Sequence, residues 1–503
     1  MTDIPSNQTS LPAEKDRHGV LFALVAMLLT AMAAGMGWGI RGQYGHESGA
    51  MIAGVLAALT LVMLFVPWTS SLRAARAAAM MTVAIGIGGS MTYGQTVGLT
   101  HDHELIGNWE ALRWGMVGLF IKGGIWIGFG GVFLGMGLGG KRYRPLEMAL
   151  LIPALLGLMF LGIWLINTPF DPANKILPRV YFSDHWYFEP DRELKPRREI
   201  WGGMLLALSS LAAYVRLVRG DKLAGRMALV GFIAGGLGFS GGQCVQAYHA
   251  WNPEVFTTGA LSAYADYFKY FNWWNMMETT FGLIWGGIMA LGLWFNRRLI
   301  AIDDVSDEVT ISPPWEVVLC VTHLVLLLTA EFLRLPRGST LIYLIVYIEF
   351  GLVMSMLPLI GIVGGRFWPY LMVLPVVAAP VVGKTLRHLT YSTEYVSQTI
   401  GWLMIVEVPM ALMLCIAAWL ICKSLKKQPG KSFAAIALLS TTWLFFDLNA
   451  MFFEGALPWE EWTGRTANQL IFGVCTISLT LAALVCGLRR SRPNVPEERA
   501  ETK

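Results

Sequence analysis

Long apolar runs alternate with short polar segments along almost the whole chain. A transmembrane helix needs about 20 consecutive, mainly apolar residues, and a window of that length predicts about fourteen spans. The predicted ranges are 19–40, 48–68, 77–99, 115–138, 147–167, 201–218, 225–246, 275–296, 314–334, 339–360, 367–384, 395–422, 432–452 and 466–487. The pattern therefore predicts an all-α, polytopic transmembrane helical bundle.

Polar segments suggest how this bundle is organised. We expect an N-terminal tail at 1–18, an N-terminal membrane bundle at 19–300, a C-terminal membrane bundle at 314–487 and a C-terminal tail at 488–503. Small residues near 31–33 resemble a signal-peptide cleavage site. Cleavage there would discard or split a motif that recurs downstream, so we expect the first apolar run to be retained as a span.

The charge pattern supports a membrane location and predicts an orientation. Only 14% of the residues are charged and 55% are hydrophobic, which excludes an ordinary soluble protein. Basic clusters mark alternate loops and the C-terminal tail, as the positive-inside rule requires. They include Arg73 and Arg76, Lys141 to Arg144, Arg216 to Arg226, Arg297 and Arg298, Arg366, Lys423 to Lys431, and Arg489 to Arg492. We therefore expect a multi-pass protein of the cell (inner) membrane with both termini cytoplasmic, whose partners are the lipid bilayer and a small polar solute, with no nucleic acid.

A glycine-glutamine motif occurs near the ends of three predicted spans, as Gly42-Gln43, Gly94-Gln95 and Gly242-Gln243. Glycine weakens a helix, and a buried amide needs hydrogen-bond partners. One interpretation is a broken helix end that presents backbone groups and a glutamine to a ligand. The alternative is close helix packing, which the G-x-x-x-G spacing of the fourth span favours. Packing alone does not require a glutamine, so we expect a site at the three motifs.

The motif belongs to an internal repeat in the N-terminal half. Gln95 and His101 superpose on Gln243 and His249 at one constant offset, and each copy is followed by Asn-Trp and a glycine-rich span. Four spans separate the copies, so they have the same orientation, which makes the repeat parallel. Gln43 and His46, in the first two spans, resemble a third and divergent copy. Arg41 occurs only in that copy, so it is the residue expected to give the site its own chemistry.

Ionisable residues inside the spans are the second group of candidates, because they are costly in lipid. Aligning the glycine pairs of the repeat puts Lys122 opposite Glu278 and suggests a buried ion pair, which either fixes the packing of two helix bundles or lines a cavity. The candidates for ion coupling or buried charge are Lys122, Glu278, His323, Glu331, Glu349, Glu407 and Asp447. The candidates for substrate binding are Arg41, Gln43, His46, Gln95, His101, Gln243 and His249.

Other chemistry has little support in the sequence. The six cysteines lie in or beside apolar segments with no C-x-x-C spacing. His101 to Glu104 offers metal-capable side chains without the spacing of a metal site, so we expect no metal and no cofactor. Walker, zinc-protease, nucleophile-elbow and dinucleotide motifs are absent. No catalytic residue is identified.

Two functions remain. The spans, the repeat and the buried carboxylates are typical of an ion-coupled secondary transporter of a polar organic solute, sugar-like or similar, with an outward-facing site. The alternative is a membrane-embedded enzyme at the outer face, such as a transferase acting on a lipid-linked or exported glycan. The ionisable candidates lie in the outer half or at mid-membrane, and the inner third has almost none, which favours the alternative. A closed floor beneath the outer site would count against transport.

Overall fold

The computed structural model describes residues 19–89, 91–183, 188, 196–302, 307–332, 357–426, 429–453 and 462–488, the side chains of 329–332 and 488 excepted. It is all-helical, with 80% helix and no strand in these ranges. Eleven of the described helices are long and apolar enough to cross a membrane. The protein is therefore a multi-pass membrane protein.

These eleven helices coincide with eleven of the predicted spans, and the other three predictions have different outcomes. The predicted span 77–99 is a shorter helix, α4 (Ser71–Gly88), followed by a break and a short helix, α5 (Gly94–Gly98). The predicted span 314–334 is α13 (Pro313–Phe332), whose side chains are described only as far as Leu328. The predicted span 339–360 lies outside the described residues except for the start of α15 (Leu357–Gly364).

Six helices of the N-terminal half pack side by side as a closed ring. They are α2 (Val20–Arg41), α3 (Glu47–Phe65), α4, α6 (Trp109–Leu138), α9 (Lys222–Trp251) and α12 (Trp273–Phe295). Each contacts the next in this order, and α12 returns to contact α2. At one end of the ring, α2, α4 and α9 finish while α3, α6 and α12 begin. We call it the Gly-Gln end, because the three motifs lie there.

Aromatic side chains fill the centre of the ring. The ring of Trp38 in α2 lies 5.0 Å from that of Trp126 in α6, although these two helices are not neighbours in the ring. Phe281 of α12 lies 4.4 Å from Trp38 and stacks on Phe239 of α9 at 4.8 Å. All four side chains are buried. We call these four residues the aromatic floor, because they close the ring below the Gly-Gln end.

Glycines allow the ring helices to approach closely. A Cβ added at Gly235 of α9 would overlap the carbonyl group of Gly123 in α6, and one at Gly131 would overlap the carbonyl of Met227. Small residues at helix interfaces are the usual means of close packing in lipid, where no hydrophobic effect drives helices together. The G-x-x-x-G glycines of α6 therefore serve packing, as their spacing predicts.

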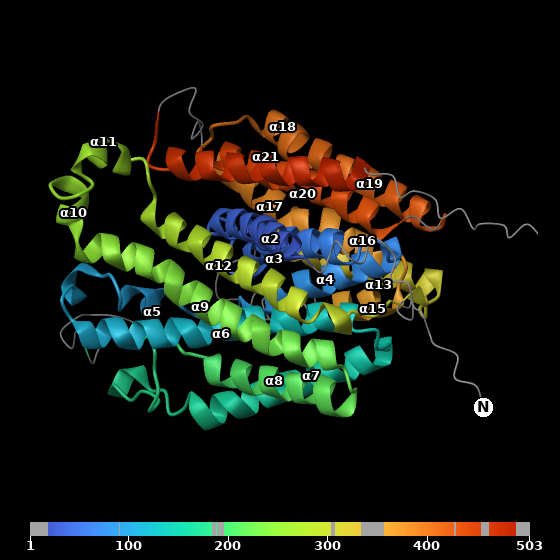
Figure 1. The fold of residues 1–503 in the computed structure, drawn as a ribbon, viewed down its shortest axis with the longest axis horizontal. Coiled ribbons are helices and arrows are strands. Elements are labelled where there is room, and N and C mark those ends of the chain that lie inside the picture. The colour runs from blue at the N-terminus through green and yellow to red at the C-terminus, as the bar shows by residue number, and fades with distance from the viewer. Residues whose placement is uncertain are drawn as a thin grey trace, which may run out of the picture.

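The remaining helices cover the ring from two sides (Figure 1). On one side, α7 (Pro145–Ile166) and α8 (Trp201–Ala213) form a pair, and α8 packs against α6. The short helices α10 (Pro253–Thr257) and α11 (Ala265–Phe268) lie beyond α9 at the Gly-Gln end.

On the other side, helices from the second half of the chain pack against α2, α3 and α4. They are α16 (Trp368–Leu371), α17 (Val377–Leu386), α20 (Gly430–Phe452) and α21 (Thr466–Leu488). Helices α18 (Gln398–Gly401) and α19 (Val408–Ser424) belong to the same half, and α19 packs against α16 and α20. A π-helical turn joins α16 to α17, and another, Trp402–Glu407, joins α18 to α19 directly before Pro409. Proline removes a backbone donor, which accounts for the interruption at the second turn.

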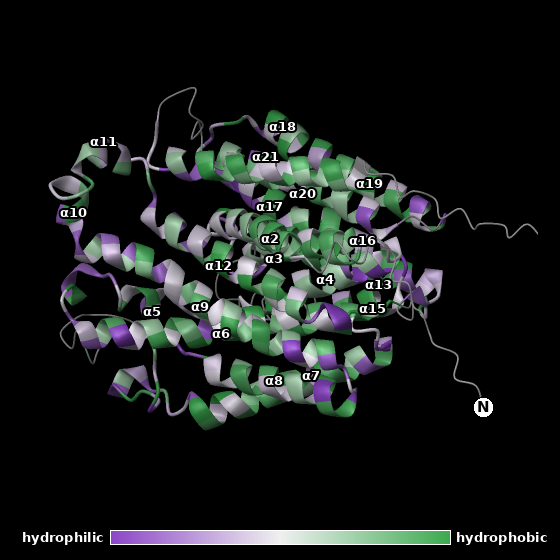
Figure 2. Cartoon of the chain, viewed as in Figure 1, coloured by the Kyte–Doolittle hydropathy of each residue, from purple (hydrophilic) through white to green (hydrophobic). Residues whose placement is uncertain are grey.

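Polar residues gather mainly at the two ends of the bundle, with apolar residues between them (Figure 2). At the end opposite the Gly-Gln motifs, Arg73 donates to the carbonyl of Leu138 at 3.0 Å. Arg76 donates to the carbonyls of Glu308 at 3.0 Å and Gly365 at 2.8 Å. We call Arg73, Arg76 and their acceptors the opposite-end network.

This network corrects one expectation, the placement of its two arginines. The pattern places both arginines in a loop, but α4 already begins at Ser71, because the Ser70 hydroxyl accepts from the backbone N–H of Arg73 and caps the helix. Both arginines are buried. Glu316 of α13 is also buried at this end of the bundle and accepts from the backbone N–H of Trp368 at 3.0 Å.

The packing of α6 on α9 predicts the effect of one methyl group. Gly235→Ala places a Cβ on the Gly123 backbone, which cannot move aside as a flexible side chain can. Overpacking of this kind costs about 1–3 kcal/mol of unfolding free energy. We expect a lower thermal unfolding temperature of the purified protein in detergent. Gly157→Ala in α7 is the matched control, because a Cβ there meets nothing within 4 Å. Equal stability of both variants would contradict the packing.

Candidate functional site

The three Gly-Gln motifs have two different structures. After α2 ends at Arg41, the Tyr44 N–H donates to the Arg41 carbonyl at 2.8 Å, and Gly45 follows with a φ of +90° that favours glycine. Gly94 likewise starts a new helix after the break that follows α4. Gly242 and Gln243, in contrast, lie inside the continuous helix α9, so the prediction of a third helix end is wrong. Gly242 instead allows close contact with Met277 and Phe281 of α12.

Arg41 is the centre of the polar site. It is only 2% exposed, and its Nη2 donates to Oε1 of Glu278 at 2.9 Å and to the hydroxyl of Tyr93. The guanidinium lies over the aromatic floor, with its Cζ 5.2 Å from the centre of the Trp38 ring and 5.4 Å from that of Trp126. Aromatic faces attract a cation, and the attraction is stronger away from water. The charge is therefore held by one carboxylate and by the rings beneath it.

Glu278 of α12 is held on one oxygen only. Its Oε1 accepts from Arg41 and, at 3.2 Å, from Nε1 of Trp274 one turn earlier. Its Oε2 is buried and has no hydrogen-bond partner. A Cβ added at Gly42 would lie 2.6 Å from Oε2. Glycine is thus required where α2 ends, because the carboxylate lies directly against that position.

Tyr93 and His46 complete this side of the site. Tyr93 is buried, and its ring lies 5.1 Å from that of His46 and 5.5 Å from that of Phe239. His46 reaches solvent at the mouth of the site, but the surrounding protein removes much of the bulk water from it. This burial, together with the nearby charges of Arg41, Lys384 and Arg197, lowers the pKa of His46 to about 4. The imidazole is therefore neutral at physiological pH.

Helix α17, from the second half of the chain, contributes a cation. Nζ of Lys384 donates to the carbonyl of Tyr44, and it lies 2.6 Å from where a Cβ of Gly45 would be. The next residue, Thr385, exchanges a hydrogen bond of 3.2 Å with the hydroxyl of Tyr44. The segment that follows α2 is thus bound directly to α17, so the site lies between the ring and the second half.

The remaining substrate-binding candidates surround this centre without joining it. Gln243 donates to the Thr100 hydroxyl at 2.7 Å, and its buried Oε1 has no partner. Gln95 accepts from the backbone N–H of Arg197 at 3.3 Å. His101 bonds the carbonyl of Val97, and His249 stacks on Trp273 at 4.0 Å. Gln43 is half-buried. The described contacts bring Arg41 and His46 together with Tyr93 but do not link the three glutamines.

The expected Lys122–Glu278 pair does not form, because each residue has another partner. Nζ of Lys122 lies 2.5 Å from Oε1 of Glu199, and it also donates to the hydroxyls of Thr96 at 2.8 Å and Ser183 at 3.2 Å. Glu199 in turn accepts from the backbone N–H of Phe182 at 3.0 Å. All donors and acceptors of this buried cluster are used, so it fastens the chain before α8 to α5 and α6.

The other ionisable candidates lie away from the centre. His323 is buried against Trp368, with the two rings 5.4 Å apart. The side chains of Glu407 and Asp447 are exposed. Glu349 and the side chain of Glu331 lie outside the described residues.

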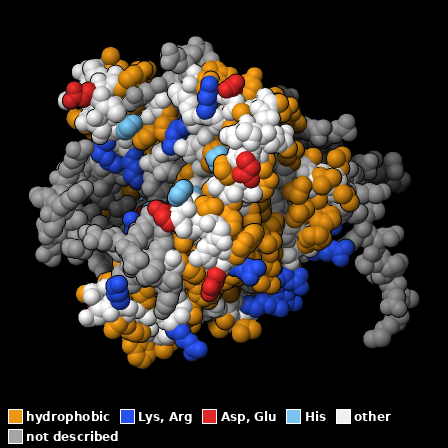
Figure 3. All heavy atoms as spheres, turned by 90° about the vertical axis from the view of Figure 1, so that its left-hand side faces the viewer, with side chains coloured by type: hydrophobic (Ala, Val, Ile, Leu, Met, Phe, Trp, Pro, Cys, Tyr) orange, Lys and Arg blue, Asp and Glu red, His pale blue; other side chains and the backbone are white. Residues whose placement is uncertain are grey.

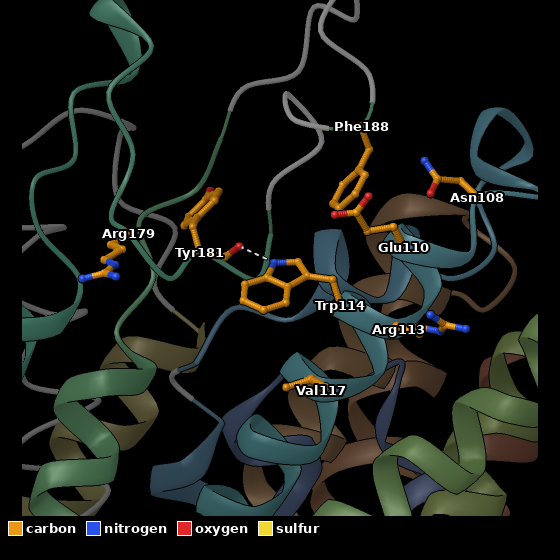
Figure 4. Close-up of a pocket in the computed structure, with 8 residues that line it drawn as sticks. All are labelled: Asn108, Glu110, Arg113, Trp114, Val117, Arg179, Tyr181 and Phe188. Carbon is orange, nitrogen blue, oxygen red and sulfur yellow. Dashed lines mark hydrogen bonds between the residues drawn. The ribbon is translucent and has the colours of Figure 1, made fainter.

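A second hollow lies at the start of α6 and is separate from Arg41. It is a cavity of about 790 Å³ lined by Asn108, Glu110, Arg113, Trp114, Val117, Arg179, Tyr181 and Phe188. The Trp114 indole lies between the other side chains and donates to the Tyr181 carbonyl at 2.9 Å (Figure 4). Most of its charged residues are exposed, so the cavity is more open than the site at Arg41.

Charged side chains and histidines lie around a hollow on the face that carries the Gly-Gln end (Figure 3). Sequence reasoning missed Tyr93, Lys384 and Glu199. Tyr93 directly precedes Gly94-Gln95, which is a usable signal. Lys384 is the last residue of a predicted span, where a cation is normally attributed to the orientation of the protein in the membrane. Glu199 lies in a loop with equal numbers of acidic and basic residues, so no pattern distinguishes it from its neighbours. In the part of the chain that the structure describes, no three His, Cys, Asp or Glu side chains group as metal ligands.

The arrangement presents cations, a half-paired carboxylate and aromatic rings to one face, which suits binding of a polar solute. No family model, curated protein or solved structure matches the chain.

The two buried ion pairs, Lys122–Glu199 and Arg41–Glu278, predict which double substitutions are non-additive in the free energy of unfolding. Lys122→Met leaves Glu199 charged and buried without its partner, which costs about 3–5 kcal/mol. We expect Lys122→Met with Glu199→Gln to be less destabilising than the sum, by about 0.5–3 kcal/mol, in urea or thermal unfolding. Lys122→Met with Glu278→Gln is the matched control and should add within about 0.5 kcal/mol. Coupling in the second pair instead of the first would contradict the contacts.

The lowered pKa of His46 predicts that the folded protein loses stability in acid. Its ordinary pKa of 6.5 falls to about 4 on folding, so between these pH values the unfolded chain binds a proton that the folded protein does not. The stability that the neutral ring contributes is complete above pH 6.5 and is lost as the pH falls towards 4. We expect His46→Gln to lose less thermal stability than the wild type between pH 7 and pH 4.5. An identical pH dependence would contradict the assigned pKa.

Proposed function

We propose that this multi-pass membrane protein is an ion-coupled secondary transporter of a polar organic solute, sugar-like or similar, and that Arg41 and Glu278 lie in its substrate site. One observation carries the proposal. A charged site lies above an apolar, aromatic floor, and a separate polar network holds α4 to α6 and to segments of the second half at the opposite end. A carrier that is accessible from one side and closed on the other has this arrangement.

The opposite-end network weighs against a purely one-sided protein. Arg73 and Arg76 bind backbone carbonyls from three other segments, and buried charges inside a membrane protein are usually retained for function. In a carrier these contacts would form the inner gate and break when the inner side opens. An enzyme at the outer face has no need of such a network.

The proposal includes the finer organisation expected from the sequence. The chain has fourteen spans in an inner membrane, with both termini cytoplasmic and the Gly-Gln end outside. The N-terminal half is a parallel repeat of helix pairs around the ring axis. Two matching helix caps support the repeat. The Asn108 side chain accepts from the N–H of Ala111 at 3.1 Å, and that of Asn272 accepts from the N–H of Asn275 at 2.9 Å.

The second candidate function is a membrane-embedded enzyme that acts at the outer face, such as a transferase using a lipid-linked or exported glycan. The closed aromatic floor favours it, because an enzyme needs no path to the other side. The cavity beside Trp114 and Arg113 offers room for such a substrate.

Uptake into proteoliposomes tests the choice. We expect the purified protein to accumulate at least one of a panel of polar solutes under a pH or sodium gradient, and Arg41→Gln to reduce that uptake at least about tenfold, since a lost charge-assisted contact costs about 1.5–3 kcal/mol. Glu254→Gln is the control, because this exposed carboxylate lies at the same end but outside the site.

A different outcome of the same experiment would reject the transporter. If no solute in the panel is taken up under either gradient while the same protein turns over a lipid-linked sugar, the transporter assignment is wrong and the enzyme replaces it.

A further inference from the structure

Among the residues that the structure describes, cations outnumber acids around the proposed substrate site. Arg41, Lys384 and Arg197 are all near enough to His46 to affect its proton affinity, and Arg465, beside the start of α21, interacts with Glu278. Arg41 is the only one of the four that has an ion pair among the described contacts, and its partner is Glu278. Lys384 donates to a backbone carbonyl, which leaves its charge uncompensated by an acid. Such a site favours a ligand that brings a negative charge.

Protonation of Glu278 breaks its ion pair with Arg41 and leaves the charge of Arg41 available to a ligand. Oε2 of Glu278 is buried and unpartnered, and a buried charged oxygen without a donor is unfavourable. A proton on that oxygen makes the carboxyl neutral. Arg41 then remains buried over Trp38 and Trp126 without an anion. A buried guanidinium without an anion is energetically unfavourable, so Arg41 then binds the carboxylate of a ligand.

We propose that the solute is an organic anion whose carboxylate binds Arg41 and Lys384, and that each anion is bound together with one proton on Oε2 of Glu278. This inference rests on the proposed function. The proton comes from the water at the mouth of the site and forms the O–H bond at Oε2, and the ion pair of Arg41 with Glu278 is replaced by that of Arg41 with the solute. One negative and one positive charge enter together, so symport of a monoanion is electroneutral.

Other titratable groups face Glu278, and they define the pH range of a test. They are Arg41 at the end of α2, Tyr93 before α5 and Arg465 before α21, while His46 and Glu47, at the start of α3, lie near Tyr93. Burial lowers the pKa of Arg465 and Glu278 opposes the change, and an arginine keeps its charge near neutrality. His46 is already neutral above about pH 4. Between pH 6 and 8 neither arginine nor His46 changes its charge, so a proton taken up with the anion is assigned to Glu278 by comparison with Glu278→Gln.

Binding to the purified full-length protein tests the inference without any transport. Gluconate and lactate serve as carboxylate probes, and glucose and 1,2-propanediol are their neutral counterparts, with calorimetry as the readout. We expect the carboxylates to bind and the neutral solutes to bind at least about tenfold more weakly. Carboxylate affinity should fall about tenfold per pH unit where Glu278 loses its proton, with one proton taken up per anion.

Three variants separate the roles. Glu278→Gln mimics the protonated carboxyl, so it should bind the carboxylate with a flat pH dependence and no proton uptake. Lys384→Gln should weaken carboxylate binding about tenfold or more while the pH slope remains. Glu199→Gln is the matched control, a second buried glutamate paired with a cation, and it should change thermal stability but leave the pH slope unaltered.

The outcomes distinguish this inference from the proposed function. Binding of the neutral solutes alone, an unaltered pH slope in folded Glu278→Gln, or binding without proton uptake would each overturn the inference, even if transport of a neutral solute is found. Proton-linked carboxylate binding without uptake into vesicles would uphold the anion site and overturn the transporter.

Discussion

The structure depends on the burial of Arg41 and Glu278 against each other. Each side chain is 2% exposed, and neither charge is tolerable there alone. The pair forms only because α2 ends beside Gly42, where any larger residue would displace the carboxylate, and because the rings of Trp38 and Trp126 lie beneath the guanidinium. The position of the site, its charge and its closure below all follow from this one interaction.

The glycine-packed ring explains why the pair can persist. Contacts of α6 with α9 and of α2 with α12 are made backbone to backbone, so the helices that carry Trp126, Arg41 and Glu278 have little freedom to separate. The second half of the chain is attached both through side chains, such as Tyr44 with Thr385, and through backbone hydrogen bonds, such as that from the Gly430 N–H to the Thr69 carbonyl at 2.7 Å.

Hydropathy predicted the helical membrane class and eleven of the long helices, because length and apolarity are local properties. The glycine-glutamine motif led to the end of the ring at which Arg41 and Glu278 are buried together. Partners were not predictable in the same way. The repeat expected from the sequence would make Lys122 and Glu278 equivalent positions, and equivalent positions around a ring need not face each other. In the structure Lys122 pairs with Glu199 and Glu278 pairs with Arg41. Arg73 and Arg76 resembled ordinary topological charges, since burial by backbone carbonyls leaves no sequence pattern.

The most direct test of the account asks from which side the site is reached. Gly94 has open space where a side chain would be, whereas Ser71 is buried at the opposite end. With the six native cysteines replaced, Gly94→Cys and Ser71→Cys are treated in intact cells with a membrane-impermeant thiol reagent. The account predicts rapid labelling at position 94 and none at position 71. Labelling at position 94 only after the reagent is admitted to the cytoplasm would contradict an outward-facing site above a closed floor.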